Sequence, residues 1–375
     1  MRICVFCFDA FGDMVLREPL FRTLLAQGHD VAAVTRGEYR AILPYISPAI
    51  ESIAASTFEH FYDAWQPNAW AAKLAELEPR VREWRPDCLL IAEASLYTSA
   101  SAADFRAFFL RFGDIPRIGM TFVEDPKKAD ELGCSQVVKV NALSHECSKY
   151  QKLLAGWLKL NGPLPQPKLT LPEPGERLAN TLSELGLRSK SYVVSCPAGA
   201  TAITNKGVPP MLAAPMAAHL YNTYGLPTLF VGVENERPQI DAITAILSEH
   251  GIPFKQWIGD RSSFPVLMEL LGASAMYTGC DTGPMHICAA LELPVLAIFG
   301  GGTYPRFLPA TDNCVTFTQK MPCSPCAWQC PYPAPPPCIA LIRIKDTIQG
   351  IDQLMARKVM SAVRHTGAFD VSWKR

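Results

Sequence analysis

The sequence has 375 residues, of which 49% are hydrophobic and 19% charged, and its basic and acidic side chains balance at 35 each. This length is sufficient for two domains of ordinary size, and the apolar fraction supplies a core for each of them. The zero formal charge and the lack of a basic run argue against a nucleic-acid partner. No apolar segment reaches the ~18 residues that a membrane-spanning helix needs.

The N-terminal segment is interpreted as a buried strand and not as a secretory signal. Residues 2–8 form an apolar run of strand length, and Asp9 and Asp13 follow it directly. Two acids at this point are incompatible with the apolar region of a signal peptide. We therefore expect a cytoplasmic protein, and peripheral contact with the inner membrane stays open.

The first half of the chain alternates between strand and helix patterns. After the first strand, residues 13–28 show the apolar spacing of a helix that ends at Gly28, a typical C-cap residue. The pattern continues with a strand at 29–36, a helix at 69–84, and strands at 85–94 and 115–122. Such alternation predicts a parallel sheet covered by helices.

A proline-rich segment then interrupts this pattern. Residues 161–176 contain five prolines and two glycines, a composition that opposes both helix and sheet. The alternation resumes with strands at 191–199, 226–233, 274–280 and 293–300, and with helices near 210–224, 237–249, 264–272 and from 283.

We predict an α/β fold with two Rossmann-like domains, residues 1–165 and 176–345, whose parallel sheets face a central cleft. Open α/β sheets bind ligands at the carboxyl ends of their strands, so the cleft is the expected site. Residues 346–375 are expected to form a helical tail, for which packing against the first domain is one option.

The first strand–helix turn excludes two common nucleotide motifs. It contains only Gly12, whereas a dinucleotide-binding turn needs G-x-G-x-x-G, and no G-x-x-x-x-G-K-[ST] occurs in the chain. Asp13 follows at the start of the helix. It could cap the helix, or it could be a carboxylate that accepts a proton in the cleft.

Polar side chains also follow strands in the second half. Thr201 and Lys206 lie in the loop after the strand at 191–199, where they could contact phosphate, although an isolated lysine is more often a solvated surface group. Glu234 and Glu236 follow the next strand. Either could accept hydrogen bonds from ribose hydroxyls, or simply begin the next helix, where acids are favoured.

The segment Asp281-Thr282-Gly283 precedes a short apolar helix, and His286 lies in the first turn of that helix. The free N–H groups of a helix start, with a glycine that lets a phosphate approach, predict an anion site suited to a diphosphate. His286 could donate a hydrogen bond to a phosphate or sugar, or be an ordinary core histidine. Asp281 could cap the helix or bind sugar hydroxyls.

Three segments, residues 11–24, 197–210 and 279–300, together resemble glycosyltransferase family 9, the ADP-heptose:lipopolysaccharide heptosyltransferases. The third segment matches the family pattern D-T-G-x-x-H-x-x-A-A-L-x-x-P from Asp281 to Pro294. The resemblance implies a GT-B fold, in which the second domain binds the donor nucleotide and the first domain binds the acceptor. It also implies an inverting transfer.

By this resemblance, Asp13 is the general base and Lys206 contacts the diphosphate of the donor. The implied donor site comprises Gly12, Thr201, Lys206, Glu236, Asp281, Thr282, Gly283 and His286. The implied reaction moves a heptose from ADP-heptose to a lipopolysaccharide core or a related surface-glycan acceptor, without a catalytic metal. The alternatives are a family 9 transferase with another donor or acceptor, a sugar-nucleotide epimerase of the same fold, and a non-catalytic nucleotide-sugar or metal-binding protein.

Four cysteines cluster near the end of the second domain, in a segment that we call the Cys-rich loop (residues 323–338). Their spacing, C-x₂-C-x₃-C-x₇-C, is compatible with a structural tetrathiolate site for zinc or iron. Unligated thiols and disulfides are the alternatives, although the odd total of 13 cysteines argues against a disulfide framework. The four residues are Cys323, Cys326, Cys330 and Cys338.

Overall fold

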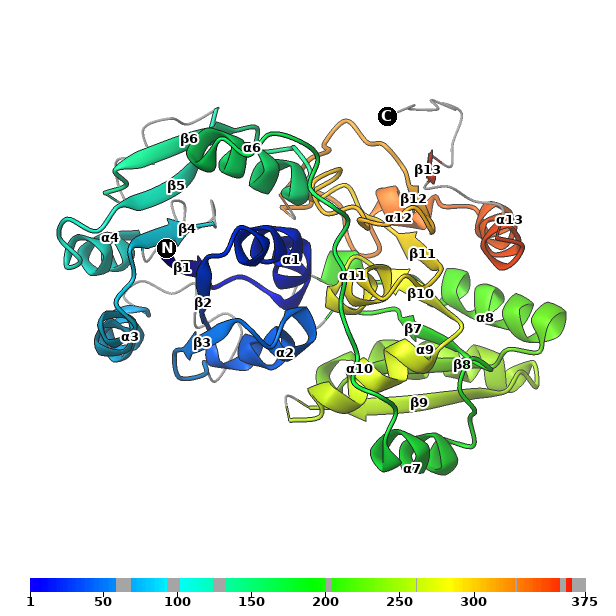
Figure 1. Cartoon of the computed structure of the whole chain (residues 1–375). Coiled ribbons are helices and arrows are strands. Elements are labelled where there is room, and N and C mark those ends of the chain that lie inside the picture. The colour runs from blue at the N-terminus through cyan, green and yellow to red at the C-terminus, as the bar shows by residue number, and fades with distance from the viewer. Residues whose placement is uncertain are drawn as a thin grey trace. The chain divides into compact units, whose positions relative to one another are not determined.

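The computed structural model describes residues 1–58, 69–92, 102–123, 133–199, 204–260, 262–327, 329–357 and 362–365. The chain divides into two compact units, Met1–Thr170 and Leu171–Arg375 (Figure 1). The division falls in the proline-rich segment, which contains neither helix nor strand from residue 159 to residue 175.

The first unit is built on a parallel sheet with the strand order β3-β2-β1-β4-β5-β6. Its strands are β1 (Arg2–Cys7), β2 (Asp30–Thr35), β3 (Glu51–Ala54), β4 (Cys88–Ile91), β5 (Arg117–Phe122) and β6 (Gln136–Val140). Its helices are α1 (Phe11–Ala26), α2 (Leu43–Ile46), α3 (Ala71–Trp84), α4 (Ala102–Leu110) and α6 (Glu146–Leu158), with the 3₁₀ helix η1 (Gly37–Ile42).

Helices cover both faces of this first sheet. Phe6 of β1 packs with Leu77 of α3 and Phe109 of α4 in one apolar cluster, and the rings of Phe6 and Phe109 meet edge to face at 4.9 Å. Helix α1 packs against α6. Because β1 is covered on both faces, its sequence is a continuous apolar run and not an alternating one.

The second unit is built on another parallel sheet, with the order β13-β12-β11-β10-β7-β8-β9. Its strands are β7 (Val193–Cys196), β8 (Thr228–Val233), β9 (Phe254–Gly259), β10 (Met276–Cys280), β11 (Val295–Ile298), β12 (Cys314–Thr318) and β13 (Ala362–His365). Its helices are α7 (Glu176–Leu185), α8 (Pro210–Tyr224), α9 (Arg237–Glu249), α10 (Phe264–Ala273), α11 (Gly283–Ala290), α12 (Pro337–Ala340) and α13 (Ile344–Met355), with the 3₁₀ helices η4 (Thr204–Lys206) and η5 (Glu234–Glu236).

The helices of the second unit also form two layers. Leu220 of α8, Ile243 of α9 and Leu354 of α13 share one apolar cluster with Phe230 and Phe317 of the sheet. Helices α10 and α11 lie on the other side of the sheet from α8 and α13 (Figure 1). Among the residues that the structure describes, no helix is both long and apolar enough to cross a bilayer.

The strand order reverses once in each sheet. In the first unit β1 lies between β2 and β4, and in the second unit β7 lies between β8 and β10. At such a reversal the connections leave neighbouring strand ends in opposite directions, which opens a crevice where α/β sheets bind ligands. Ligand sites are therefore expected at the carboxyl ends of β1 and β4, and at those of β7 and β10.

The structure adds elements that the sequence analysis did not predict, and it corrects the expected tail. Strands β3, β6, β9 and β12 had no predicted counterpart, and most residues of β6 and β9 are only half-buried. Within residues 346–375, expected to be a helical tail, the described part is the remainder of α13 followed by strand β13. Helix α13 packs on α8, and β13 pairs with β12, so both belong to the second unit.

Candidate functional site

The turn from β1 into α1 carries Gly12 and Asp13, as the sequence predicts. Asp13 is the third residue of α1, and its Oδ2 accepts a hydrogen bond from the backbone N–H of Ala10 at 3.3 Å. A carboxylate in the first helical turn is stabilised by the free N–H groups there. Asp13 is half-buried. It therefore supports the helix start and still has contact with solvent.

A buried ion pair supports this turn, and the sequence analysis did not single it out. The Arg17 side chain is 0% exposed and donates to both carboxylate oxygens of Asp9, from Nη1 to Oδ1 at 2.8 Å and from Nη2 to Oδ2 at 2.6 Å. Burial by itself opposes the charge, but the Asp9 carboxylate holds the pKa of Arg17 above its ordinary value. Asp9 precedes α1 and is eight residues from Arg17, so the four-residue spacing that pairs charges along a helix does not signal this contact in the sequence.

In the second unit, a glycine lets two strands meet where the strand order reverses. Gly279, in β10, has a φ of +156°, and a Cβ on it would lie 2.3 Å from the carbonyl oxygen of Cys196 in β7. A side chain at this position would push the strands apart. The glycine therefore brings the carboxyl end of β7 close to the residues that lead into α11.

Lys206, Asp281 and His286, three residues of the expected donor site, come together at this point. Asp281 is only 4% exposed, and its Oδ2 lies 3.3 Å from the Lys206 Nζ. Its Oδ1 lies 3.7 Å from the His286 Nε2. Burial raises the pKa of the Asp281 carboxyl, but the charge of Lys206 and the contact with His286 outweigh burial and hold it below its usual range.

The start of α11 offers groups that suit an anionic ligand. Thr282 is the N-cap residue, and its hydroxyl lies 3.4 Å from the hydroxyl of Tyr277. His286 is buried, and its Nδ1 has no hydrogen-bond partner among the described residues. Buried polar atoms normally have partners. An unpartnered imidazole nitrogen therefore lies in the first turn of α11.

The two acids considered as ribose acceptors have different surroundings. Glu236 is 6% exposed; its Oε2 accepts from the Val233 N–H at 3.0 Å, and its Oε1 lacks a partner in the described part of the chain. Burial raises the pKa of Glu236 to about 7. Glu234 is exposed and paired with Arg237 at 2.8 Å. Glu236 is therefore the acid with an unused oxygen next to the second sheet.

The remaining predicted donor residues are not all part of this cluster. Thr201 lies outside the described residues. Gly12 is buried in the first unit, at the start of α1. The residues that the structure brings together in the second unit are Lys206, Asp281, Thr282, Gly283 and His286.

The Cys-rich loop collects its four sulfurs in one neighbourhood without closing a metal site. Cys338 is buried, and its Sγ accepts a hydrogen bond from the Gly301 N–H at 3.4 Å. Its pKa is raised, first by burial and then by the other three cysteines. All four are free thiols. Among the described residues, no group of three or more His, Cys, Asp or Glu side chains is placed to hold a metal ion.

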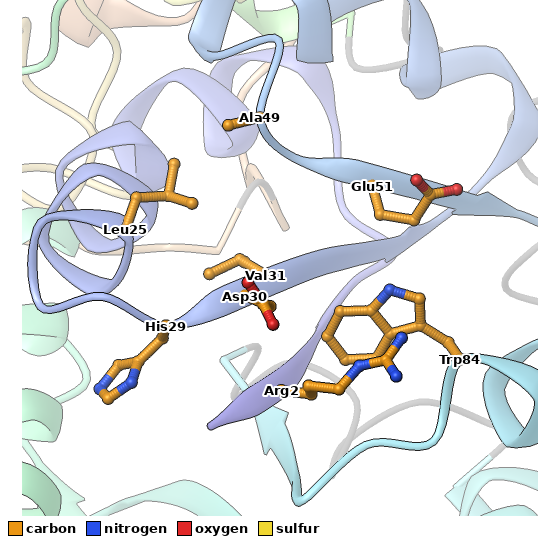
Figure 2. Close-up of a pocket in the computed structure, with 8 residues that line it drawn as sticks. All are labelled: Arg2, Leu25, His29, Asp30, Val31, Ala49, Glu51 and Trp84. Atoms are coloured by element: carbon orange, nitrogen blue, oxygen red, sulfur yellow. The ribbon is translucent and has the colours of Figure 1, made fainter.

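A hollow of about 310 Å³ lies at the opposite edge of the first sheet, at the amino ends of β1, β2 and β3 (Figure 2). Arg2 lies over the ring of Trp84 there, 4.7 Å from its centre. The lining residues are Arg2, Leu25, His29, Asp30, Val31, Ala49, Glu51 and Trp84, and none of them is a predicted site residue. The hollow is therefore separate from the candidate sites at the carboxyl edge.

Comparison with known proteins decides the family. A family model described as glycosyltransferase family 9 (heptosyltransferase) matches residues 105–333, more than half of the chain. The chain belongs to glycosyltransferase family 9. Lipopolysaccharide heptosyltransferase 3 of Escherichia coli (strain K12) is 33% identical over 69 residues, which cover 17% of this chain and only 20% of that relative.

Solved structures of this family share the fold. E. coli ADP-heptose lps heptosyltransferase II is similar with a TM-score of 0.70 at 17% identity, over 96% of this chain and 99% of that chain. E. coli heptosyltransferase WaaC with ADP-2-deoxy-2-fluoro heptose is similar with a TM-score of 0.63 at 16% identity, over 95% and 99%. Dodecameric iron-containing heptosyltransferase TibC is similar with a TM-score of 0.53 at 14% identity, over 95% of this chain and 76% of that chain. The predicted α/β class of the GT-B type is confirmed, and the family match favours a transferase over an epimerase.

The burial of Glu236 predicts a pH-dependent stability. Between its ordinary pKa of 4.5 and about 7, the folded protein keeps a proton on Glu236 that the unfolded chain has lost. The free energy of unfolding should therefore fall as pH rises through this window, by up to about 1.4 kcal/mol per pH unit. Chemical denaturation at several pH values in this window should show that the free energy of unfolding changes less with pH in Glu236→Gln than in the wild type. The exposed control Glu234→Gln should keep the wild-type slope, and parallel curves for all three proteins would contradict the prediction.

Proposed function

We propose that this protein transfers a heptose from ADP-heptose to a lipopolysaccharide core or a related surface glycan, with inversion at the anomeric carbon. The observation that carries the proposal is the buried contact of Lys206 and His286 with Asp281 at the start of α11. It lies within the segment that matches the heptosyltransferase family. A similar structure was solved with ADP-2-deoxy-2-fluoro heptose. Another donor or acceptor within family 9 is the second candidate.

The donor diphosphate would bind at the start of α11. Lys206 supplies a positive charge, and the start of α11 adds the N–H of Gly283 and the positive end of the helix dipole. Pro284 has no N–H, and the N–H groups of Met285 and His286 are bonded to the carbonyl oxygen of Thr282. The Thr282 hydroxyl and the unpartnered Nδ1 of His286 add polar contacts. Asp281 would accept hydrogen bonds from sugar hydroxyls. We place Thr201 and Gly12 in the same donor site by their match to the family motifs.

The nucleoside end of the donor would be held by Glu236. Its Oε1 is buried without a partner among the described residues, so a ribose hydroxyl could satisfy it. Because the pKa is raised to about 7, the side chain can accept a hydrogen bond when ionised and donate one when protonated. Ribose carries hydroxyls that serve in both ways.

The reaction needs a base on the acceptor side and stabilisation of the leaving group on the donor side. Asp13 would take the proton of the attacking hydroxyl, and such general-base assistance contributes roughly 10²–10⁴-fold in rate. The diphosphate gains negative charge as it leaves, and Lys206 and the start of α11 would stabilise that charge. In this mechanism the chain's own residues supply the acid–base and electrostatic parts, so we propose no catalytic metal. The proposed transfer requires Asp13 and Lys206 to act on the same pair of substrates.

We further propose that the Cys-rich loop binds one structural zinc or iron. Thiolates are ligands that both metals accept, and the sulfurs of Cys323, Cys326 and Cys330 are near enough to Cys338 to raise its pKa. The similar TibC structure is iron-containing. Because the described residues form no closed metal site, the metal would have to draw the four sulfurs together.

A glycolipid acceptor would also bring the protein into peripheral contact with the inner membrane.

Asp13→Asn should keep donor binding and lose transfer, because the amide preserves the shape of the side chain but cannot take up a proton. We expect kcat to fall roughly 10²–10⁴-fold. Transfer from ADP-heptose to heptose-free lipopolysaccharide measures kcat, and calorimetry with ADP-heptose measures donor affinity. Glu234→Gln serves as a control for an exposed acid. Full activity of the Asp13 variant would remove it as the base.

Lys206→Ala should weaken the binding of the donor because one cation of the diphosphate site is lost. A thermal-shift panel of nucleoside diphosphates and nucleotide sugars tests this, and ADP and ADP-heptose should stabilise the wild-type protein most. The Lys206 variant should lose about 1.5–3 kcal/mol of donor binding energy, the usual contribution of a hydrogen bond to a charged group. Lys255→Ala, an exposed lysine of β9, should bind normally. A response to UDP or GDP sugars instead would redirect the proposal to another donor.

Elemental analysis of the purified protein should find about one zinc or iron per chain if the Cys-rich loop is a four-sulfur site. The double variant Cys326→Ser, Cys330→Ser should lose the metal and melt at a lower temperature. Cys134→Ser, a half-buried cysteine of the first unit, should retain the metal. A fully folded wild-type protein without metal would contradict the proposal.

A further inference from the structure

A buried ion pair occupies the point in the first unit where the strand order reverses. Arg17 is 0% exposed and Asp9 is 15% exposed, and two hydrogen bonds join them. The Nη2 of Arg17 also donates to the carbonyl oxygen of Ala92, the residue after β4, at 3.3 Å. One guanidinium therefore connects the turn after β1 with the end of β4.

A buried pair of this kind is not explained by stability alone. Removing both charges from water costs several kcal/mol per ion, and well-packed apolar side chains are often as stable. The Arg17 guanidinium also lies over the ring of Tyr150, 5.4 Å from its centre, on helix α6. The pair sits at the edge of the sheet where the first unit carries its candidate base.

Asp13 lies between the two members of the pair in sequence and close to them in space. Asp13 and Arg17 are one helical turn apart on α1, so their side chains share a face. The Asp13 Oδ2 is held by the N–H of Ala10, the residue next to Asp9. The pKa values of Tyr39 and Tyr150 are raised first by burial, and both Asp9 and Asp13 raise them further. The carboxylates of Asp9 and Asp13 are therefore both close enough to Tyr39 and Tyr150 to interact with them electrostatically.

We propose that the Asp9–Arg17 ion pair is a positioning device for Asp13, which fixes the turn that carries this carboxylate and leaves it able to accept a proton. The inference rests on the proposed function, in which Asp13 is the base. An unbalanced Arg17 would hold Asp13 in its ionised form and weaken it as a base. The negative charge of Asp9 without Arg17 would disfavour the ionised form of Asp13. The pair cancels both effects.

Other ionisable groups near this turn come from two further elements. Helix η1 and the residue before it contribute Tyr39 and the ion pair of Arg36 with Glu38. Helix α6 contributes Tyr150 and the ion pair of Glu146 with Lys149, at 2.6 Å. The charges within each of these two pairs balance, while Arg40 of η1 and Lys152 of α6 add positive charge outside them. These groups are the same in every variant, so a difference between variants in the pKa of Asp13 reports the change at Asp9 or Arg17.

The test is the titration of the Asp13 carboxyl carbon by NMR, in full-length protein labelled at aspartate carboxyls and assigned by the loss of one signal in Asp13→Asn. Asp9→Asn leaves Arg17 unbalanced, so the apparent pKa of Asp13 should fall by about one unit. Arg17→Gln leaves Asp9 unbalanced, so it should rise by about one unit. Arg17→Lys keeps the charge and should stay near the wild-type value. A pair that lies too far from Asp13 to act on it would give no shift in either variant.

Kinetics provide a second measurement on the same variants. With ADP-heptose and heptose-free lipopolysaccharide, Asp9→Asn should lower kcat by about tenfold, leave the KM for the donor unchanged, and move the acid limb of the pH profile to lower pH. Glu269→Gln breaks a comparable two-bond pair with Arg177, at 2.6 and 3.0 Å in the second unit, and should leave the profile unchanged.

The outcomes separate this inference from the proposed function. Shifts of the same sign, or no shift in either variant, overturn the inference even if Asp13→Asn abolishes transfer. Full transfer by Asp13→Asn overturns the role of Asp13 as base, whatever the titrations show. If Arg17→Gln does not fold, Asp9→Asn and Arg17→Lys still decide the result. Asp9→Asn should fold, because its amide oxygen can still accept a hydrogen bond from Arg17.

Discussion

The reversal of strand order beside β1 and beside β7 is the constraint on which both candidate sites depend. Parallel strands need buried faces, so the central strands of each sheet are mostly apolar, and the charged groups beside them lie at the strand ends. Where the order reverses, two such loops diverge and leave space for a ligand. Gly279 permits the close strand approach at one reversal, and the Arg17 contact with Ala92 joins the strands at the other.

Both sites hold a cation against a carboxylate, and in each pair one of the two partners is buried. Lys206 is paired with Asp281, and Arg17 is paired with Asp9. An unpaired charge at these depths would be costly, and the pairing lets the free protein hold the cation in place. In the second unit, the contacts with Asp281 hold Lys206 near the start of α11, where the proposed donor diphosphate would bind. In the first unit the balance leaves a separate carboxylate, Asp13, at the turn.

The Cys-rich loop is attached to the same sheet edge as the proposed donor site. The Gly301 N–H donates to the Cys338 Sγ, and the Ala327 N–H donates to the Gly302 carbonyl oxygen at 2.8 Å. These glycines follow β11, which pairs with β10, the strand that ends just before Asp281. The loop thus packs on the chain that continues from the neighbouring strand. These contacts link the conformation of the Cys-rich loop to the chain that follows β11.

The sequence by itself determined the alternation of strands and helices, the division at the proline-rich segment, and the placement of Asp13 and Asp281 at helix starts. These features are local, because apolar spacing, proline content and glycine position depend on neighbouring residues. Edge strands such as β9 were not predicted, because half-buried strands carry fewer apolar residues and so a weaker apolar pattern in the sequence. Only the tertiary structure separated buried Glu236 from exposed Glu234 and joined Arg17 to Asp9, since burial and ion pairing depend on contacts that the folded chain alone creates.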